Sequence, residues 1–272
     1  MINSAANKQV RRVVNLVKKA RARREEGLYI VEGIRMVLEL LPEQVEQIYV
    51  SESFLRAHQD KELSAFLSMF HWEPVADPVM KVMADTQTPQ GILALVRQRH
   101  YTLKEILNRP PAGQAHHLII LETLQDPGNL GTILRAGEGA GITGVVMDEM
   151  TADIYNPKVI RSTMGSVYRV PFVYVSDLKA ACQEMKQAGI CLFAAHLSGE
   201  KNYDQQDFTV PCGFLLGNEA RGLSQDTALL AHTLVRIPMA GRVESLNAAV
   251  AASVLMFETA RQRRIGKNCK NH

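Results

Sequence analysis

Three short segments in the C-terminal half of the chain combine polar side chains with glycines and apolar residues. They are Asn129-Leu-Gly-Thr-Ile-Leu-Arg135, Leu215-Leu-Gly-Asn-Glu-Ala-Arg-Gly-Leu223 and Ile237-Pro-Met-Ala-Gly-Arg-Val-Glu-Ser-Leu-Asn247. A glycine at the end of a strand, as at Gly217, lets the backbone approach a ligand closely. Ile237 and Leu246 could form an apolar wall against a flat ring such as a purine. Together the segments indicate a ligand pocket beside groups that donate and accept hydrogen bonds, although each alone would fit an ordinary turn.

A fourth segment, Gly139-Ala-Gly-Ile-Thr-Gly144, matches the dinucleotide-binding pattern G-x-G-x-x-G in its letters only. That pattern must follow a strand and open a helix, so that the helix N-terminus meets a pyrophosphate. Here the glycines close a predicted helix and lead into a predicted strand. We interpret them as a helix C-cap and turn, which argues against a nicotinamide-dependent dehydrogenase.

Strand and helix patterns alternate through the half of the chain that holds these segments. Apolar runs predict strands at His117 to Leu121, Gly144 to Met147, Val170 to Val175, Ile190 to Ala195, Gly213 to Leu216 and Leu234 to Arg236. Helical spacing predicts helices at Leu130 to Ala140, Pro157 to Met164, Leu178 to Ala188 and Leu246 to Arg261. Such alternation is typical of an α/β domain with a mostly parallel sheet that is covered on both faces. In this arrangement Arg135 lies in the second turn of its helix, near Asn129.

The N-terminal hundred residues show a smaller α/β pattern of their own. It predicts strands at Leu28 to Val31, Val45 to Val50 and Gly91 to Val96, and helices at Ile34 to Leu41, Ser53 to Phe70 and Val79 to Ala84. The following segment contains Asn108-Arg-Pro-Pro-Ala-Gly-Gln114, whose paired prolines favour an extended connection over a continued helix. We therefore predict a domain at 1–100, a linker at 101–116 and a second domain at 117–272.

The first 24 residues carry eight cations and no acid: Lys8, Arg11, Arg12, Lys18, Lys19, Arg21, Arg23 and Arg24. The rest of the chain has 23 Lys and Arg against 28 Asp and Glu, so a basic arm precedes a mildly acidic protein. Apolar residues recur at helical spacing through the arm, at Val10, Val13, Val14 and Val17. They predict one helix with cations around its other faces. So many cations without an acid favour contact with nucleic-acid phosphates over a merely solvated face.

Composition excludes several classes of protein. Apolar residues make up 46% of the chain and charged residues 22%, as in soluble globular proteins. The chain has neither a run of about 20 apolar residues nor the apolar core of a secretory signal, so we predict a cytoplasmic protein without membrane contact. The cysteines are spaced too widely for a Cys-x-x-Cys site and are expected to be free thiols: Cys182, Cys191, Cys212 and Cys269. No histidine spacing indicates a metal site, because His116 and His117 would point to opposite faces of a strand.

In this order and with these residues, the three segments resemble the three motifs of the SpoU/TrmH family within the SPOUT methyltransferases. The likeness extends from about His117 to Arg264. The N-terminal hundred residues, with Tyr29-Ile-Val-Glu-Gly33 and Gln90-Gly-Ile-Leu-Ala-Leu-Val96, resemble the family's L30e-like substrate-binding domain. The resemblance implies an enzyme that methylates the 2'-hydroxyl of RNA riboses with S-adenosylmethionine. It also implies a homodimer and a deep trefoil knot, which no periodicity would reveal.

The resemblance also implies roles for individual residues. Matching positions contact the cofactor at Gly217, Ile237 and Leu246, and we add their neighbours Leu216 and Met239 and the loop residue Leu197. The polar site residues are Asn129, Arg135, Glu219, Ser245 and Asn247. Glu219 and Asn247 are expected to orient the site and Ser245 to contact the ribose, and which group accepts the proton is left open.

Arg135 matches the family's catalytic arginine. Because a guanidinium has a pKa above about 12 and rarely gives up its proton, we expect Arg135 to hold an RNA phosphate or stabilise the developing alkoxide. Arg161 lies in a stretch that often faces RNA in the family, although a simple helix-surface charge fits it equally well. With Arg11, Arg12, Lys18 and Lys19 it completes the predicted RNA contacts.

Two further functions compete with this prediction. A non-enzymatic RNA-binding protein would not need all five polar site residues, and a SPOUT base methyltransferase is disfavoured by the Asn-x-Gly-x-Ile-x-Arg segment. The two-domain layout favours ribosomal RNA, and 23S ribosomal RNA in particular, over transfer RNA as the substrate.

Overall fold

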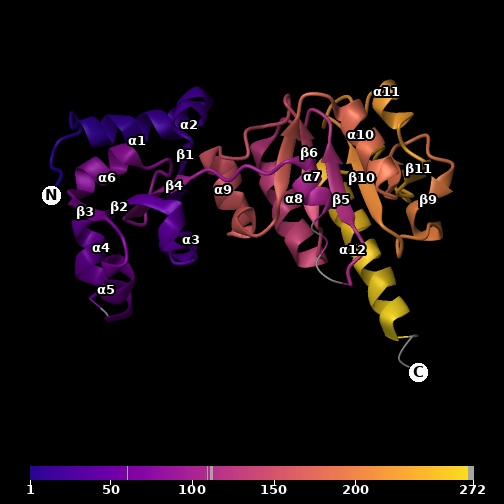
Figure 1. Ribbon diagram of the computed structural model, residues 1–272. Coiled ribbons are helices and arrows are strands. Elements are labelled where there is room, and N and C mark those ends of the chain that lie inside the picture. Colours follow the sequence, from indigo (N-terminus) through magenta and orange to yellow (C-terminus); the bar gives the residue numbers. More distant parts are fainter. Residues whose placement is uncertain (60, 109, 111–112, 269–272) are drawn as a thin grey trace. The chain divides into compact units, whose positions relative to one another are not determined.

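The computed structural model describes residues 1–59, 61–108, 110 and 113–268 of the chain (Figure 1). Its chain divides into two compact units. The first consists of Met1–Arg99 and Asp153–Gly165, and the second of His100–Ala152 and Ser166–His272. Each unit is an α/β structure with its own sheet and its own apolar core.

The sheet of the first unit has four strands in the order β1-β4-β2-β3. They are β1 (Leu28–Glu32), β2 (Val45–Ser51), β3 (Trp72–Val75) and β4 (Ile92–Arg97). β4 is antiparallel to β1 and β2, whereas β2 and β3 are parallel, so the sheet is mixed. β3 is not among the strands predicted from the sequence, because its four residues include a proline and do not alternate in polarity.

The described part of residues 1–99 contains six α-helices: α1 (Lys8–Lys18), α2 (Ala20–Glu26), α3 (Ile34–Val37), α4 (Glu52–Ala57), α5 (Lys61–Ser68) and α6 (Asp77–Met83). The apolar stripe predicted for the basic arm is confirmed, since Val10 and Val13 are fully buried. The single helix predicted there is wrong, because extended backbone at Lys19 separates α1 from α2. The predicted helix from Ser53 to Phe70 is likewise two helices. The backbone leaves the helical region at His58 (φ −124°, ψ 74°).

Residues 153–165 also belong to the first unit, far from it in the sequence. Their helix α9 (Pro157–Thr163) packs on β1. Arg23 of α2, only 3% exposed, donates to Asp153 Oδ2 over 2.9 and 2.6 Å. The Tyr155 hydroxyl donates to the Arg99 carbonyl over 2.7 Å. The one boundary predicted between residues 100 and 117 does not account for this segment, because such long-range contacts leave no mark on sequence periodicity.

The sheet of the second unit has seven strands in the order β7-β6-β5-β10-β8-β11-β9, and all of its pairings are parallel. The strands are β5 (His117–Leu121), β6 (Gly144–Asp148), β7 (Phe172–Val175), β8 (Cys191–Ala195), β9 (Lys201–Asn202), β10 (Cys212–Leu216) and β11 (Thr233–Arg236). β5 and β10 lie side by side in the middle of the sheet and are buried along their whole length. The predicted parallel sheet is confirmed.

The helices of the second unit are α7 (Leu103–Leu107), α8 (Pro127–Ala140), α10 (Leu178–Gln187), α11 (Gln225–Ala228) and α12 (Ala248–Asn268). α12, yellow in Figure 1, packs against α8 and β10. The segment predicted as an extended linker contains α7, which begins with a Thr102–Glu105 capping box and buries Ile106 completely. Arg109, Pro111 and Ala112 of that segment lie outside the described residues.

Two predictions about helix ends come out differently. The interpretation of the 139–144 glycines as a C-cap is confirmed, because α8 ends at Ala140 and Gly141 adopts a left-handed conformation with φ 75°. The last helix, predicted to end at Arg261, continues as far as Asn268. Arg263 explains why, since its guanidinium donates to the carbonyls of Ala115 and His116 over 2.9 and 2.7 Å.

Candidate functional site

The carboxyl ends of the parallel strands gather the three segments at one edge of the seven-stranded sheet. α8 follows β5, Gly217 follows β10 and Ile237 follows β11. The Glu122 N–H donates to the Leu216 carbonyl over 2.9 Å, so the chain segments leaving β5 and β10 start in contact. Ligands of open parallel sheets bind outside this edge.

A cavity of about 370 Å³ lies at this edge, within the size range of small-molecule sites. Its lining includes every residue predicted to bind the cofactor: Leu197, Leu216, Gly217, Ile237, Met239 and Leu246. Glu219 and Ser245 line it as well, whereas Asn129, Asn247 and Arg135 do not. The structure thus brings together residues that follow three separate strands, β8, β10 and β11.

The backbone packing at this edge of the sheet requires a glycine at position 217. A Cβ atom at this position would lie 2.2 Å from the carbonyl carbon and oxygen of Gly222 and from the nitrogen of Leu223. Gly222 has a left-handed backbone (φ 70°), and Asn218 and Gly222 exchange backbone hydrogen bonds of 3.1 and 2.8 Å across the turn. Hence any side chain at Gly217 would disrupt the 217–223 turn whether or not a ligand is bound.

Three of the predicted polar residues form one chain of hydrogen bonds. Asn247 Nδ2 donates to Asn129 Oδ1 over 2.9 Å, and Asn129 Nδ2 donates to Glu219 Oε1 over 3.0 Å. At one end, Asn247 Oδ1 accepts from the Ala249 N–H and thereby caps α12. At the other end, Glu219 accepts from the N–H groups of Gln125 and Asp126 over 3.2 and 2.9 Å. This Asn247-Asn129-Glu219 relay ties together the starts of α12 and α8 and the turn after β10.

The relay also fixes the charge state of Glu219. Burial by itself would raise the pKa of this carboxyl group, but the hydrogen bonds from Asn129 and from backbone N–H groups outweigh it and hold the pKa below its ordinary value of 4.5. Glu219 is therefore ionised at neutral pH with both oxygens engaged. A carboxylate in this state orients its neighbours and is a poor proton acceptor.

Arg135 lies apart from the relay. Because α8 begins at Pro127 and not at Leu130, the arginine falls in the third turn of the helix, about 9 Å along the axis from Asn129, and not in the second turn. Its side chain is exposed, and no hydrogen bond or ion pair engages it among the residues that the structure describes. A guanidinium without an internal partner is available to a ligand or to another chain.

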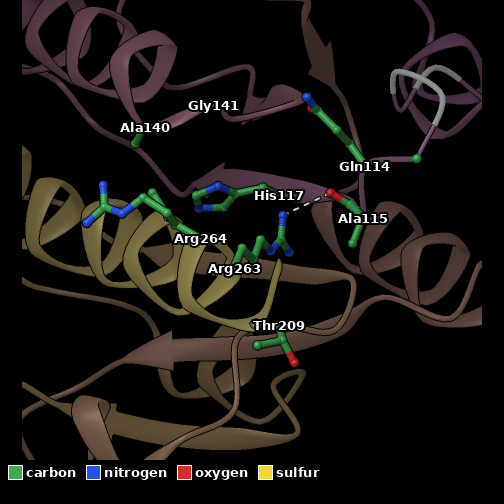
Figure 2. Close-up of a pocket in the computed structure, with 11 residues that line it drawn as sticks. Gln114, Ala115, His117, Ala140, Gly141, Thr209, Arg263 and Arg264 are labelled. Carbon is green, nitrogen blue, oxygen red and sulfur yellow. Dashed lines mark hydrogen bonds between the residues drawn. The ribbon is translucent and has the colours of Figure 1, made fainter. Parts of the chain in front are cut away.

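A larger cavity of about 600 Å³ lies at the opposite edge of the same sheet (Figure 2). It is lined by His117 at the start of β5, by Arg263 and Arg264 of α12 and by none of the predicted cofactor or catalytic residues. Arg263 is occupied there by backbone carbonyls, including that of Ala115 (dashed in Figure 2). We assign this arginine to fastening α12 onto the loops before β5 and β10.

The predicted RNA contacts all belong to the first unit, and they differ in how free their charges are. Arg11, Lys18 and Lys19 are exposed. Arg12 instead donates to Glu26 over 2.5 Å and to Glu46 over 2.7 Å. Arg161 forms an ion pair with Asp85. The positive charge of the basic arm is therefore smaller in the fold than in the sequence, since Arg21 and Arg23 are paired with acids as well.

Several polar residues at the site escape the sequence analysis. Asp126 accepts from the Asn129 N–H over 2.8 Å as the N-cap of α8, and an aspartate before a proline is a readable signal for such a cap. Asn218 Oδ1 accepts from the N–H groups of Ala220 and Arg221, closing the 217–223 turn. Asp148 ends β6 and binds the turn after β5 through Thr123. No spacing in the sequence points to this last contact.

Within the described parts of the chain, no group of three or more His, Cys, Asp or Glu residues is arranged to hold a metal ion. None of the described helices combines the length and apolar character of a membrane span. Cys182, Cys191 and Cys212 are free thiols as predicted, whereas Cys269 lies outside the described residues.

Comparison with known proteins assigns both units. Residues 116–257 match the SpoU rRNA methylase family, and residues 7–94 match the MRM3-like substrate binding domain. The chain belongs to the SpoU rRNA methylase family. This membership confirms the predicted class of enzyme, an S-adenosylmethionine-dependent RNA 2'-O-methyltransferase.

Individual relatives match this chain over most of its length. The 23S rRNA (guanosine(2553)-2'-O)-methyltransferase RlmP of Bacillus subtilis is 30% identical over 94% of this chain and 97% of its own length. The 23S rRNA (guanosine-2'-O-)-methyltransferase RlmB of Pseudomonas putida is 30% identical over 88% of this chain and 98% of its own. Among solved structures, an AdoMet-bound rRNA methyltransferase from Sinorhizobium meliloti superposes with a TM-score of 0.81 at 25% identity, covering 96% of this chain and 97% of that one.

Proposed function

We propose that this enzyme methylates a ribose 2'-hydroxyl of 23S ribosomal RNA, with the cofactor in the 370 Å³ cavity and the substrate ribose at its polar rim. The observation that carries the proposal is the Asn247-Asn129-Glu219 relay, which borders a cavity lined by every residue predicted to bind the cofactor. The relatives that cover nearly all of this chain act on 23S rRNA by name, which supports this substrate over transfer RNA.

The cavity suits S-adenosylmethionine in its chemistry. Ile237, Met239 and Leu246 offer apolar surface for the adenine, and the turn that begins at Gly217 offers backbone groups. The cofactor supplies an electrophilic methyl group, so the protein's task is to bind, orient and exclude water. The ionised Glu219 lies in the lining, where its negative charge favours a cationic sulfonium.

The polar residues of the rim then act on the RNA. Ser245 is exposed at the cavity edge and can hydrogen-bond the ribose. Arg135, with no partner among the described side chains, is assigned to an RNA phosphate or to the alkoxide that develops as the hydroxyl attacks. Glu219 holds Asn129 and the start of α8 in place rather than taking the proton, because its pKa is lowered and its oxygens are occupied.

The first unit is proposed to bind the RNA body. Arg11, Lys18 and Lys19 are exposed on the basic arm and its end, and they pair with no acid among the residues that the structure describes. Arg12 and Arg161 are weaker candidates than the sequence suggests, because acids of the same unit already neutralise them.

The protein is further proposed to be a homodimer with a knotted second unit. α12 exposes Val250 and Phe257, two turns apart and 49% and 51% exposed. Phe257 lies beside Gly139 of α8, and this surface is where an apolar contact with a second copy would bury area. The knot is proposed from the resemblance of the second unit to the SPOUT methyltransferases.

The test is site-by-site mapping of 2'-O-methyl groups in total RNA from cells with and without the gene, followed by methylation of the unmodified 23S rRNA with purified protein. We expect one ribose in 23S rRNA to lose its methyl group in the deletion and to regain it in vitro. Methyl groups that change on a base, or on a transfer RNA, would overturn the proposed substrate.

A further inference from the structure

Thr123 has a backbone conformation that β-branched residues avoid. Its φ is +55°, and among the described residues only Met164 shares a positive φ without being glycine. Left-handed backbone costs energy for any side chain with a Cβ, and such outliers persist where surrounding contacts hold them, often at functional sites. Thr123 lies between the end of β5 and the start of α8, in the turn that faces the 217–223 turn.

The carboxylate of Asp148 holds this turn. Asp148 is the last residue of β6, the strand next to β5. Its Oδ2 accepts from the Thr123 N–H over 2.9 Å and from the Thr123 hydroxyl over 2.8 Å. Its Oδ1 accepts from the N–H and hydroxyl of Thr151 over 2.8 and 2.7 Å. All four contacts are charge-assisted, and they tie the turns after the two strands together.

The same turn meets the 217–223 turn at two points. The Thr123 carbonyl accepts from Asn218 Nδ2 over 2.9 Å, and the next residues Gln125 and Asp126 donate their N–H groups to Glu219. A change at Thr123 therefore reaches Asn218 and Glu219 through backbone atoms. The relay residue Asn129 is bound to the same Glu219 oxygen as Asp126.

We propose that Asp148 and Thr123 are positioning residues of the methyl transfer reaction, which act by fixing Glu219 and Asn218 at the cavity. The inference rests on the proposed function for its reaction, but the geometry it invokes is a property of the free protein. Neither residue lines the cavity, so any effect on catalysis passes through the two turns.

The chain offers a matched pair of substitutions for the test. Thr123→Val keeps the shape and the β-branch and removes only the hydroxyl that Asp148 binds. Thr143→Val makes the same change at the other end of β6, where the Thr143 hydroxyl accepts from the His117 N–H over 3.0 Å. Thr123→Val loses one hydroxyl contact and Thr143→Val loses two, because the Thr143 hydroxyl also donates to the His117 carbonyl over 3.3 Å. The unfolding midpoint of Thr143→Val should therefore fall at least as far as that of Thr123→Val.

Methyl transfer to RNA is measured in single turnovers at saturating cofactor. We expect Thr123→Val to lose about tenfold in rate, Thr123→Ser to stay within about threefold of the wild type, and Thr143→Val to be unchanged, since a hydrogen bond to a charged group is worth about tenfold or more. In a double-mutant cycle, Thr123→Val combined with Glu219→Gln should lose less than the product of the two separate losses. A wild-type rate for Thr123→Val, an equal loss in Thr143→Val, or fully multiplicative losses would overturn the inference.

A second readout does not depend on activity. The side-chain carboxyl of Glu219 is titrated by carbon-13 NMR in the free protein, in which hydrogen bonds hold its pKa below the ordinary value. The pKa of Glu219 should rise in Thr123→Val and remain unchanged in Thr143→Val. An unchanged pKa in Thr123→Val would overturn the positioning role of Asp148 and Thr123. If the wild type transfers no methyl group to RNA, the proposed function fails while this titration still decides the positioning role.

Discussion

Replacement of Arg135 should slow catalysis without affecting folding. The Arg135 side chain is exposed and engages no partner among the described residues. Its removal should therefore change the free energy of unfolding by no more than about 0.5 kcal/mol, a shift of about 1–2 °C in the unfolding midpoint. Arg135 does not line the cavity either, so the dissociation constant of S-adenosylmethionine should stay within about twofold of the wild type.

The expected loss of rate in Arg135→Ala is far larger. A preorganised electrostatic contact to a developing charge is worth about 100- to 1000-fold, which corresponds to about 2.7–4 kcal/mol in the transition state. The rate constant kcat and kcat/KM should fall together, because the contact forms only as the hydroxyl reacts. Arg135→Lys should be nearly as slow, since an ammonium cannot make a two-pronged contact.

Single-turnover transfer of labelled methyl groups to RNA, followed by digestion to nucleosides, measures this loss. Arg264→Ala is the matched control, because Arg264 is an exposed helical arginine of the same unit at the opposite edge of the sheet. Near-normal transfer by Arg135→Ala, or a loss matched by Arg264→Ala, would refute the catalytic assignment. Label on a base would refute the reaction itself.

Three further outcomes follow from the structure. Ile237→Arg should raise the dissociation constant of S-adenosylmethionine at least tenfold in calorimetry, because it removes part of the apolar wall and places a cation beside the sulfonium. The control Leu229→Arg, on the exposed surface, should leave the dissociation constant unchanged. Replacing Arg11, Lys18 and Lys19 together by alanine should weaken RNA binding in fluorescence anisotropy. It should also reduce the slope of the logarithm of the binding constant against the logarithm of salt concentration by up to about 3, and an unchanged slope would show that the basic arm does not contact the RNA. Burial, with a smaller contribution from Arg263, lowers the pKa of His117 to about 3 from 6.5. The unfolded state therefore binds a proton that the folded state excludes. The free energy of unfolding, measured with denaturant, should fall by about 2 kcal/mol as the pH drops from 6.5 to 5, and His117→Leu should make this dependence on pH weaker.

The regular part of the fold was readable from the sequence because burial sets its periodicity. The strands β5 and β10 are buried throughout and read as continuous apolar runs, and α1 shows its buried face in the spacing of Val10 and Val13. The errors fall where a few local contacts outweigh periodicity. β3 is four residues long and contains a proline. α4 ends before His58, whose backbone leaves the helical region and whose ring stacks on Phe54.

Long-range polar contacts account for the rest. Residues 153–165 join the first unit through the buried Arg23 and its bond to Asp153, 130 positions away. In the sequence Arg23 is one of eight similar cations, and nothing distinguishes it from Arg24 beside it. Its 3% exposure and its carbonyl and carboxylate partners exist only in the folded chain.

At the site, the motifs identify the residue types, but only the fold determines their hydrogen bonds and charge states. The family resemblance picks out Glu219 but leaves open whether it orients or accepts a proton. Only the fold places the N–H groups of Gln125 and Asp126 and the amide of Asn129 on its two oxygens. These donors outweigh the partial desolvation of the carboxyl group and lower its pKa. At neutral pH a proton taken from the ribose would therefore have to displace the hydrogen bonds that Gln125, Asp126 and Asn129 donate. We therefore propose that Glu219 positions its neighbours and that another group accepts the proton of the 2'-hydroxyl.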